Sequence, residues 1–307
     1  MPFLSSQPTT PLKGGPVWLG ILVCAVLWGS AFPVIKLVYA HWAEQGVTPD
    51  FSLRALFSGV RFVIAGGALL LLARHPWAEL RATGWSWVVA MALTQTVGQY
   101  VLFYWGLELS SGALASLLVS SGSFWWVLLA PRLGHSPGLT TRQWWVLGAG
   151  ALGVTLAVYS PGVTTGNPQL GAIAILGANL FGALGLACFQ KIKPTMGTRA
   201  GTGFSLFLGG IILVGLGAHS AWRGDLSLFD EYVVVCTLWL AFVSAAAFAL
   251  WNHLSTIMPS HQLATYRFLI PVCGVFESLW LLDNEHLTPA MMAGGAIVCG
   301  AMLFVRR

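Results

Sequence analysis

Charged side chains are scarce in this chain. Asp, Glu, Lys and Arg together make up only 8% of its 307 residues, whereas hydrophobic residues make up 56%. A soluble domain carries about 25% charged residues. The composition therefore excludes a soluble fold of this length, and we expect a protein whose solvent is the hydrocarbon of a lipid bilayer.

The chain also lacks the motifs of common metal sites and enzymes. Its five cysteines lie in apolar runs and form no CxxC pair, which argues against a disulfide framework or a zinc site. HExxH, P-loop and GxSxG sequences are absent. We expect no enzymatic activity, no cofactor and no metal. The net charge of +5 forms no basic stripe, so nucleic acid is not an expected partner.

Long apolar runs make up most of what is present. A helix needs about 20 mostly apolar residues to cross a bilayer, and helices are the default because unpaired backbone groups cannot face lipid. The pattern predicts an all-α integral membrane protein with ten transmembrane helices. The ten runs are 16–40, 53–73, 84–107, 111–131, 143–159, 169–190, 203–218, 232–252, 263–282 and 288–305.

The loop cations predict the orientation of these spans. If both termini are cytoplasmic, the inner loops hold ten Lys and Arg residues and the outer loops hold only Arg54 and Arg223, as the positive-inside rule requires. We therefore expect a multi-pass protein of a bacterial inner membrane with both termini in the cytoplasm. The inner cations are Lys13, Arg74, Arg81, Arg132, Arg142, Lys191, Lys193, Arg199, Arg306 and Arg307.

Short matches between the two halves of the chain indicate an internal repeat. Leu27-Trp28-Gly29 matches Leu180-Phe181-Gly182, and Leu114-Ala115 matches Leu263-Ala264 at nearly the same offset. We expect two five-helix repeats, residues 1–160 and residues 161–307, within one membrane domain. Because five is odd, the second repeat would be inverted relative to the first, a recurring design in transporters.

Several of these stretches resemble a known family. Trp28-Gly29-Ser30-Ala31-Phe32-Pro33-Val34-Ile35-Lys36 is similar to the first-span signature of EamA-type transporters in the drug/metabolite transporter superfamily, and Leu114-Ala115-Ser116-Leu117-Leu118 resembles their fourth span. Ser123 stands where the family often has a proline. The resemblance implies a ten-span fold, a central cavity between the halves, and export or import of small metabolites.

Charges inside a bilayer are costly, so each is a functional candidate. Lys36, Arg61 and Glu277 all fall in the outer half of the membrane. They predict a coupling site or a site for a substrate carboxylate, with Glu277 as a group that could exchange a proton. Snorkelling of Lys36 to the headgroups and an ion pair between Arg61 and Glu277 are the structural alternatives. Arg267, at the inner end of its span, is expected to anchor in the headgroups.

Neutral polar and aromatic side chains within the spans are the candidate substrate-binding residues. Two serines of the fourth predicted span, Ser120 and Ser123, could instead serve close helix packing. Gln95 and Gln99 could form an interhelical hydrogen bond. The candidates are Trp28, Gln95, Gln99, Tyr104, Ser120, Ser123, Asn179, Ser244, Trp251 and Asn252.

Prolines, tryptophans and glycines add three structural expectations. Pro33 and Pro271 predict kinks or hinges. Tryptophans at span ends, such as Trp42 and Trp222, are typical of interfacial belts. Runs of glycines in the fifth, seventh and tenth spans suit close helix packing or the face of a homodimer.

These features together predict a secondary transporter of small metabolites, amino acids or related compounds, that works by alternating access with export favoured. The chain holds no nucleotide-binding motif, so a gradient would drive or direct transport. Three alternatives stay open: efflux of lipophilic cations, a membrane scaffold without transport, and an enzyme acting on lipid headgroups.

Overall fold

Every regular element that the structure describes is helical. The computed structural model describes residues 14–119, 121–129, 140–158, 167–258, 263, 266–267, 269–283 and 286–305. The elements are α1 (Gly14–Glu44), α2 (Phe51–Leu71), α3 (Pro76–Thr83), α4 (Trp85–Met91), the π-helical segment η1 (Ala92–Gly98), α5 (Gln99–Glu108), α6 (Gly112–Val119), α7 (Gly122–Leu129), α8 (Thr141–Val158), α9 (Pro168–Ile192), α10 (Thr198–Leu216), α11 (Ala218–Trp222), the 3₁₀ turn η2 (Asp225–Leu228), α12 (Glu231–Ile257), α14 (Leu269–Leu281) and α15 (Pro289–Val305).

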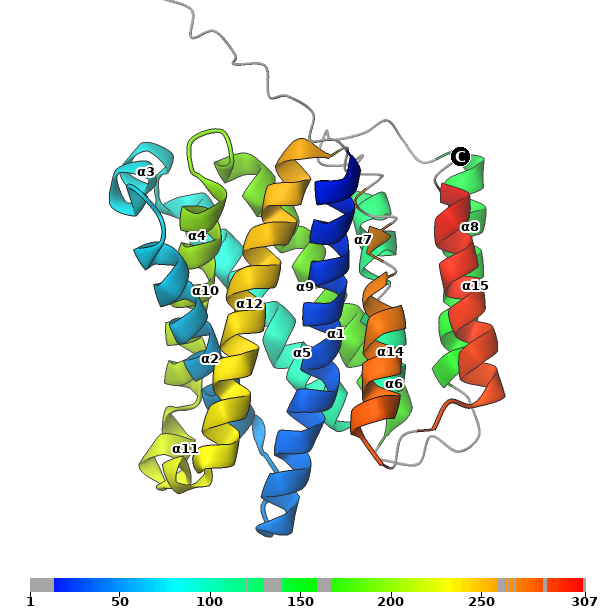
Figure 1. The fold of residues 1–307 in the computed structure, drawn as a ribbon, viewed down its shortest axis with the longest axis horizontal. Coiled ribbons are helices and arrows are strands. Elements are labelled where there is room, and N and C mark those ends of the chain that lie inside the picture. The colour runs from blue at the N-terminus through cyan, green and yellow to red at the C-terminus, as the bar shows by residue number, and fades with distance from the viewer. Residues whose placement is uncertain are drawn as a thin grey trace, which may run out of the picture.

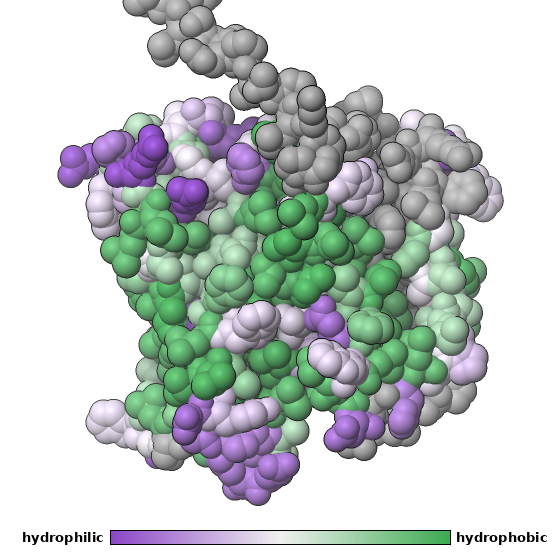
Figure 2. Space-filling model, in the orientation of Figure 1, coloured by the Kyte–Doolittle hydropathy of each residue, from purple (hydrophilic) through white to green (hydrophobic). Residues whose placement is uncertain are grey.

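Five of these helices are long and apolar enough to cross a bilayer: α1, α2, α9, α10 and α12. Shorter apolar helices such as α14 lie beside them (Figure 1). Figure 2 shows a largely apolar band across the middle of the molecule, with hydrophilic side chains at its two ends. The chain therefore has the surface of a multi-pass membrane protein.

The bundle has two ends that orient the rest of the description. We call the end where α1 begins and α15 finishes the terminal end, and the other end the distal end (Figure 1). Three helices begin at the distal end with a side-chain cap: Asp50 accepts from the Leu53 N–H, Asn167 from the Leu170 N–H, and Asp230 from the Val233 N–H. Such caps satisfy the free amide groups where a helix emerges from its apolar surroundings.

The two halves of the chain are interlocked. Helix α1 of the first half packs against α12 and α14 of the second, and α9 of the second half packs against α5, α6 and α7 of the first. At one side of the bundle α2 lies along α10, and at the opposite side α8 lies along α15 (Figure 1). Helices α1 and α9, the first of each half, run in opposite directions, since α1 ends and α9 begins at the distal end.

Glycines allow the close crossing of α2 and α10. A Cβ atom at Gly66 would lie 2.3 Å from the backbone nitrogen of Phe207, and one at Gly59 would lie 2.6 Å from that of Val214. No side chain fits at these distances, so the two backbones are in direct contact, as is common where small residues line membrane helices. Of the glycines expected to serve packing or a dimer face, Gly210 packs inside the chain, because a Cβ atom there would lie 2.6 Å from the backbone nitrogen of Val63. A Cβ atom at Gly148, Gly215 or Gly300 would meet no described atom within 4 Å.

One tryptophan at a span end is not part of an interfacial belt. Trp42 is fully buried, and its Nε1 donates a hydrogen bond to the Leu228 carbonyl at 2.9 Å. The expectation for Trp42 is therefore wrong, because the turn before α12 folds over the end of α1. Trp222, by contrast, is 91% exposed.

Candidate functional site

A central cavity lies between the two halves. The space between its walls, open solvent included, is about 740 Å³. Helices of both halves contribute its walls, which combine aromatic rings, amides and two guanidinium groups. Its lining residues include Trp28, Phe32, Arg61, Gln95, Gln99, Tyr100, Phe103, Asn179, Phe248, Trp251 and Arg267.

Arg61 enters this cavity from α2 and is almost fully buried. Its Nε donates to the Ser244 Oγ at 2.8 Å, and its Nη1 donates to the Tyr104 hydroxyl at 2.8 Å. Ser244 Oγ in turn donates to the Leu240 carbonyl at 2.9 Å, so it is free to accept from Arg61. These partners hold the guanidinium in place, but they are neutral and leave its positive charge uncompensated.

Aromatic rings also surround the Arg61 guanidinium. Its Cζ lies 4.7 Å from the centre of the Phe62 ring, 5.3 Å from that of Tyr100 and 5.9 Å from that of Tyr104. Such contacts stabilise a cation while presenting no carboxylate to it. The charge is therefore available to an anion inside the cavity.

Arg267 brings a second cation to the same cavity. It lies just before α14, and a Cβ atom at Gly122 would be 3.1 Å from its Cζ, so the guanidinium sits against the start of α7. Its Nε is buried without a hydrogen-bond partner among the described residues. The expectation that Arg267 anchors in the headgroups is wrong, because the side chain turns inward to the cavity.

The amide side chains of Gln95 and Gln99 both line the cavity from one wall. Gln95 lies in η1, and Gln99 begins α5. In each residue the Oε1 atom is buried and accepts no hydrogen bond from the described part of the chain. The cavity thus holds unused acceptors as well as an unused donor, which is what a polar ligand requires.

Aromatic residues form the apolar wall of the cavity. The ring of Trp28 lies 5.2 Å from Phe248 and 5.4 Å from Trp251, measured between centroids. Phe32 and Phe103 lie edge to face at 5.7 Å on the same lining. Rings at this spacing offer stacking surface to an apolar or aromatic group.

Asn179 has a holding role within the lining. Its Nδ2 donates to the Leu118 carbonyl at 3.0 Å and to the Ser121 Oγ at 2.9 Å. Leu118 lies in the last turn of α6, and Ser121 stands between the end of α6 and the start of α7. Asn179 therefore ties α9 to the interruption in the fourth predicted span.

Three other candidates, Tyr104, Ser244 and Asn252, are described but do not line the cavity. Tyr104 and Ser244 hold Arg61, as described above. Asn252 donates to the Thr202 Oγ1 at 2.8 Å, and its Oδ1 has no described partner. Ser120 lies outside the described residues, as does the side chain of Ser123.

Lys36 and Glu277 are not part of the cavity lining. Lys36 donates from its Nζ to the Ser110 carbonyl at 2.9 Å and to the Leu107 carbonyl at 3.3 Å, so it binds the carbonyl end of α5. Glu277 lines a separate groove at the surface. The suggested ion pair between Arg61 and Glu277 is accordingly not formed.

The lining residues that sequence reasoning missed include three aromatic residues, Phe32, Tyr100 and Phe103, and one cation, Arg267. The three aromatic residues stand in apolar runs, where a ring facing the cavity and a ring facing lipid give the same pattern. A charge within the ninth predicted span was a usable signal for Arg267, but its position near the span end pointed to the headgroups.

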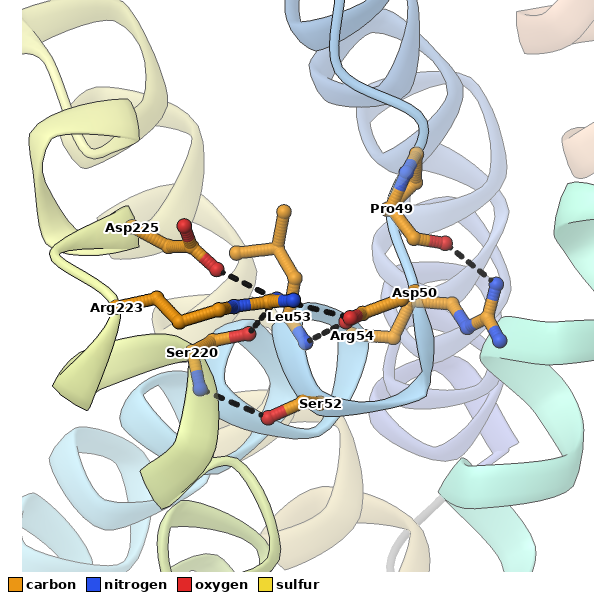
Figure 3. A network of polar contacts seen from close by, with 8 residues as sticks. All are labelled: Pro49, Asp50, Ser52, Leu53, Arg54, Ser220, Arg223 and Asp225. Carbon is orange, nitrogen blue, oxygen red and sulfur yellow. Dashed lines mark hydrogen bonds and ion pairs between the residues drawn. The ribbon is translucent and has the colours of Figure 1, made fainter.

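Ion pairs gather at the distal end of the bundle, and Figure 3 shows those of Arg223. Arg223 lies 2.8 Å from both Asp50 and Asp225, and Arg54 pairs with Glu108 inside the first half. Burial opposes ionisation of Asp50, but the Leu53 N–H and Arg223 together lower its pKa below the usual value. His41 of α1 contacts Asp230 at the start of α12. The contacts of Arg223 with Asp50 and of His41 with Asp230 join the distal ends of the two halves.

No cluster suited to a metal occurs within the described ranges, where no three His, Cys, Asp or Glu residues come together. The guanidinium and amide groups that line the cavity can recognise a polar or anionic solute.

Comparison with known proteins identifies the family. The model of the EamA-like transporter family matches residues 16–159 and, a second time, residues 169–307. The chain belongs to the EamA-like transporter family. EamA proteins are membrane transporters of small molecules and not enzymes. The double match gives the chain the two-repeat EamA architecture.

A solved structure supports the same fold. One crystal structure of a protein is 16% identical, covers 96% of this chain and 99% of its own, and superposes with a TM-score of 0.60. At that identity the likeness concerns the EamA fold alone. No curated protein matches the chain.

Proposed function

We propose that this EamA protein is a secondary transporter of small metabolites, amino acids or related compounds that carry a carboxylate. The single observation that carries the proposal is the pair of guanidinium groups, of Arg61 and Arg267, that face one cavity whose described lining includes no Asp or Glu. A charge buried without a counter-ion is expensive, so an anionic group of the substrate is its natural partner.

The unused hydrogen-bonding atoms favour a zwitterion over a simple anion. The carboxylate would accept from the guanidinium groups, and an ammonium group would donate to the Oε1 atoms of Gln95 and Gln99. The side chain of the substrate would lie on the rings of Trp28, Phe103 and Trp251.

Alternating access follows from the arrangement of the halves. The cavity lies where the two repeats meet, so rocking one against the other would open it to either side of the membrane. Pro33, inside α1, and Pro271, in the first turn of α14, would serve as hinges. The contacts of Asp50, Arg223 and Asp225 would close the distal end.

The proposal includes a topology. Ten crossings result if α4, η1 and α5 form the third span, and α6 with α7 the fourth. The repeats would be 1–160 and 161–307, inverted relative to each other, with both termini on the cytoplasmic side of a bacterial inner membrane. Export is proposed as the direction of transport, driven or directed by a gradient.

Glu277 is proposed as the group that carries a proton, and Lys36 as a residue that fixes the end of α5. If Glu277 couples protons to transport, the Glu277→Gln variant loses the pH dependence of transport. An unchanged pH profile would refute that role.

Efflux of lipophilic cations is the rival within the transporter class. Two guanidinium groups in the cavity repel a cation, so this cavity disfavours it. A scaffold without transport, or an enzyme acting on lipid headgroups, would show no saturable flux of any metabolite.

Counterflow in proteoliposomes tests the proposal. Purified protein is reconstituted with a high internal concentration of unlabelled amino acid, and uptake of the labelled compound is followed for a panel of amino acids. Each is paired with the amine that lacks only its carboxylate. The proposal predicts saturable counterflow of at least one amino acid and none of its decarboxylated partner; no flux above protein-free liposomes for any compound contradicts it.

A further inference from the structure

A second cavity, unrelated to the central one, opens on the surface formed by α1, α12 and α14. The space along this lateral groove, including the part open to its surroundings, is about 1500 Å³, and its walls are almost wholly apolar. Four of its wall residues have large exposed fractions: Val235 60%, Val272 51%, Phe276 70% and Trp280 76%. Figure 2 shows this face of the molecule largely covered with apolar side chains. In a membrane the groove is open to hydrocarbon.

Glu277 is the one carboxylic acid among the described residues of this lining. Its side chain is half-buried, and its Oε2 atom is buried and accepts no hydrogen bond from the described residues. The groove's other polar groups are satisfied or weak. Trp239 donates from Nε1 to the Ser30 Oγ at 3.1 Å, and that hydroxyl donates to the Leu27 carbonyl at 2.8 Å. The remaining polar atoms are thiols.

Among the described residues no Lys, Arg or His lines the groove, so this part of the chain supplies Glu277 with no counter-ion there. A carboxyl group in such surroundings is either protonated or paired with a cation that comes from outside. The low local dielectric makes such a pairing strong. The rest of the groove would accept an apolar chain.

We propose that the lateral groove is a binding site for lipophilic amines, entered from the membrane, in which the protonated nitrogen pairs with Glu277 and the alkyl or aryl part lies on Phe276 and Trp280. Charge complementarity sets this occupant apart from a lipid acyl chain or a second copy of the protein. Neither of these would need an acid at this depth. The proposal does not depend on the function proposed for the central cavity.

Photolabelling tests the proposal on the full chain in lipid nanodiscs. The probe is a long-chain primary alkylamine with a diazirine in its chain, and the matched probe is the alcohol of the same length. Labelled peptides are identified by mass spectrometry. The amine is expected to label groove residues such as Val34, Val235 and Phe276, and not cavity residues of the same helices such as Phe32 and Trp251. The alcohol is expected to label the groove far less.

Two variants make the test specific to Glu277. The Glu277→Gln variant keeps the shape and removes the charge, so amine labelling of the groove is expected to fall about 10- to 100-fold, as loss of a charge-assisted contact requires. The control is Glu231→Gln, which removes an exposed carboxylate at the start of α12 and is expected to change nothing. If Glu277→Gln does not fold, as judged by gel filtration, competition decides: unlabelled amine must displace the probe from wild type and unlabelled alcohol must not.

Three results would overturn the proposal. Equal labelling by amine and alcohol would mean that the groove binds any alkyl chain without selecting for a positive charge. Labelling confined to residues that line the central cavity, such as Phe32, Gln99 and Trp251, would place the amine there. Cross-links between two copies, without probe in the groove, would make this face an interface between protomers.

Discussion

Arg61 shows how a single charge is kept inside a bilayer. Its hydrogen-bond partners are the Ser244 hydroxyl, from the other half of the chain, and the Tyr104 phenol. Three aromatic rings surround the guanidinium, and none of these groups neutralises its charge. A charged donor in this position is stable only while its hydrogen bonds are complete. Arg61 therefore has two roles: its hydrogen bonds stabilise the fold near the cavity, and its charge would bind the substrate.

Removing the phenol that accepts from Arg61 tests this dependence. In Tyr104→Phe the Nη1 atom loses its 2.8 Å acceptor and stays buried, which costs about 1–3 kcal/mol. We expect a lower melting temperature in detergent, measured by tryptophan fluorescence. Tyr232→Phe, at an exposed position, serves as the control and should melt like wild type. Equal melting temperatures for all three proteins would mean that Tyr104 does not support Arg61.

The contact between Gly122 and Arg267 gives a second prediction. A methyl group at Gly122 would lie 3.1 Å from the guanidinium carbon, so Gly122→Ala must shift the Arg267 guanidinium by a few tenths of an ångström. We expect a higher KM for transport with little change in melting temperature, because a long side chain can move more easily than a helix. The control is Gly148→Ala, which has no atom within 4 Å of the new methyl group. A KM equal in both variants would separate Arg267 from substrate binding.

At this scale the sequence identified residue types better than their directions. It selected Trp28, Gln95, Gln99, Asn179 and Trp251, all of which line the cavity. Polar groups in apolar runs stand out, and so they could be found. Arg267 and Trp42 were misplaced because depth along a helix does not tell whether a side chain turns to lipid, to water or inward.

Among the elements, the crossing of α2 and α10 depends most directly on side-chain size. Neighbouring positions allow a matched test, because a Cβ atom at Gly66 would lie 2.3 Å from the Phe207 nitrogen, whereas one at Gly67 would lie 3.8 Å from the Phe207 ring. Gly66→Ala must separate two backbones, and overpacking of this kind costs about 1–3 kcal/mol. We expect Gly66→Ala to lower the melting temperature and Gly67→Ala to leave it near that of wild type. The reverse order would show that the helices do not cross here.

The start of α12 carries a pH dependence. The hydrogen bond from the Val233 N–H, and next the contact with His41, hold the pKa of Asp230 below its usual value. A lowered pKa means that the carboxylate stabilises the fold above the usual pKa, and that this contribution is lost as the pH falls through the folded value. Between about pH 5 and about pH 3, wild type should lose more thermal stability than Asp230→Asn. Parallel loss in both proteins would contradict the assignment.

Hydropathy could predict where helices exist but not where they are interrupted. The runs 16–40, 53–73 and 169–190 correspond closely to α1, α2 and α9. The run 84–107 instead contains η1, and the run 111–131 divides into α6 and α7. Apolar composition is the same on both sides of these interruptions, because backbone irregularity inside a membrane protein is stabilised by neighbours such as Asn179 and not by local sequence.

For the whole molecule, the repeat could be read from short matches such as Leu27-Trp28-Gly29 with Leu180-Phe181-Gly182, and the family model matches each half separately. The way in which the two halves interlock could not be predicted from the sequence. It depends on which helix faces meet across the repeat boundary, as in the pairing of α2 with α10 and of α8 with α15. The cavity results from that pairing, so its two arginines could not be brought together by pattern alone.

The most direct measurement of the central claim is the transport rate of Arg267→Gln in proteoliposomes, for a counterflow substrate and for the amine that lacks its carboxylate. If Arg267 receives the carboxylate, the variant should transport the amino acid about 10- to 100-fold less efficiently and discriminate less between the two compounds. Trp222→Phe, at an exposed position, should behave as wild type. An Arg267→Gln protein with wild-type efficiency and wild-type discrimination would contradict the claim that this cavity binds an anionic group.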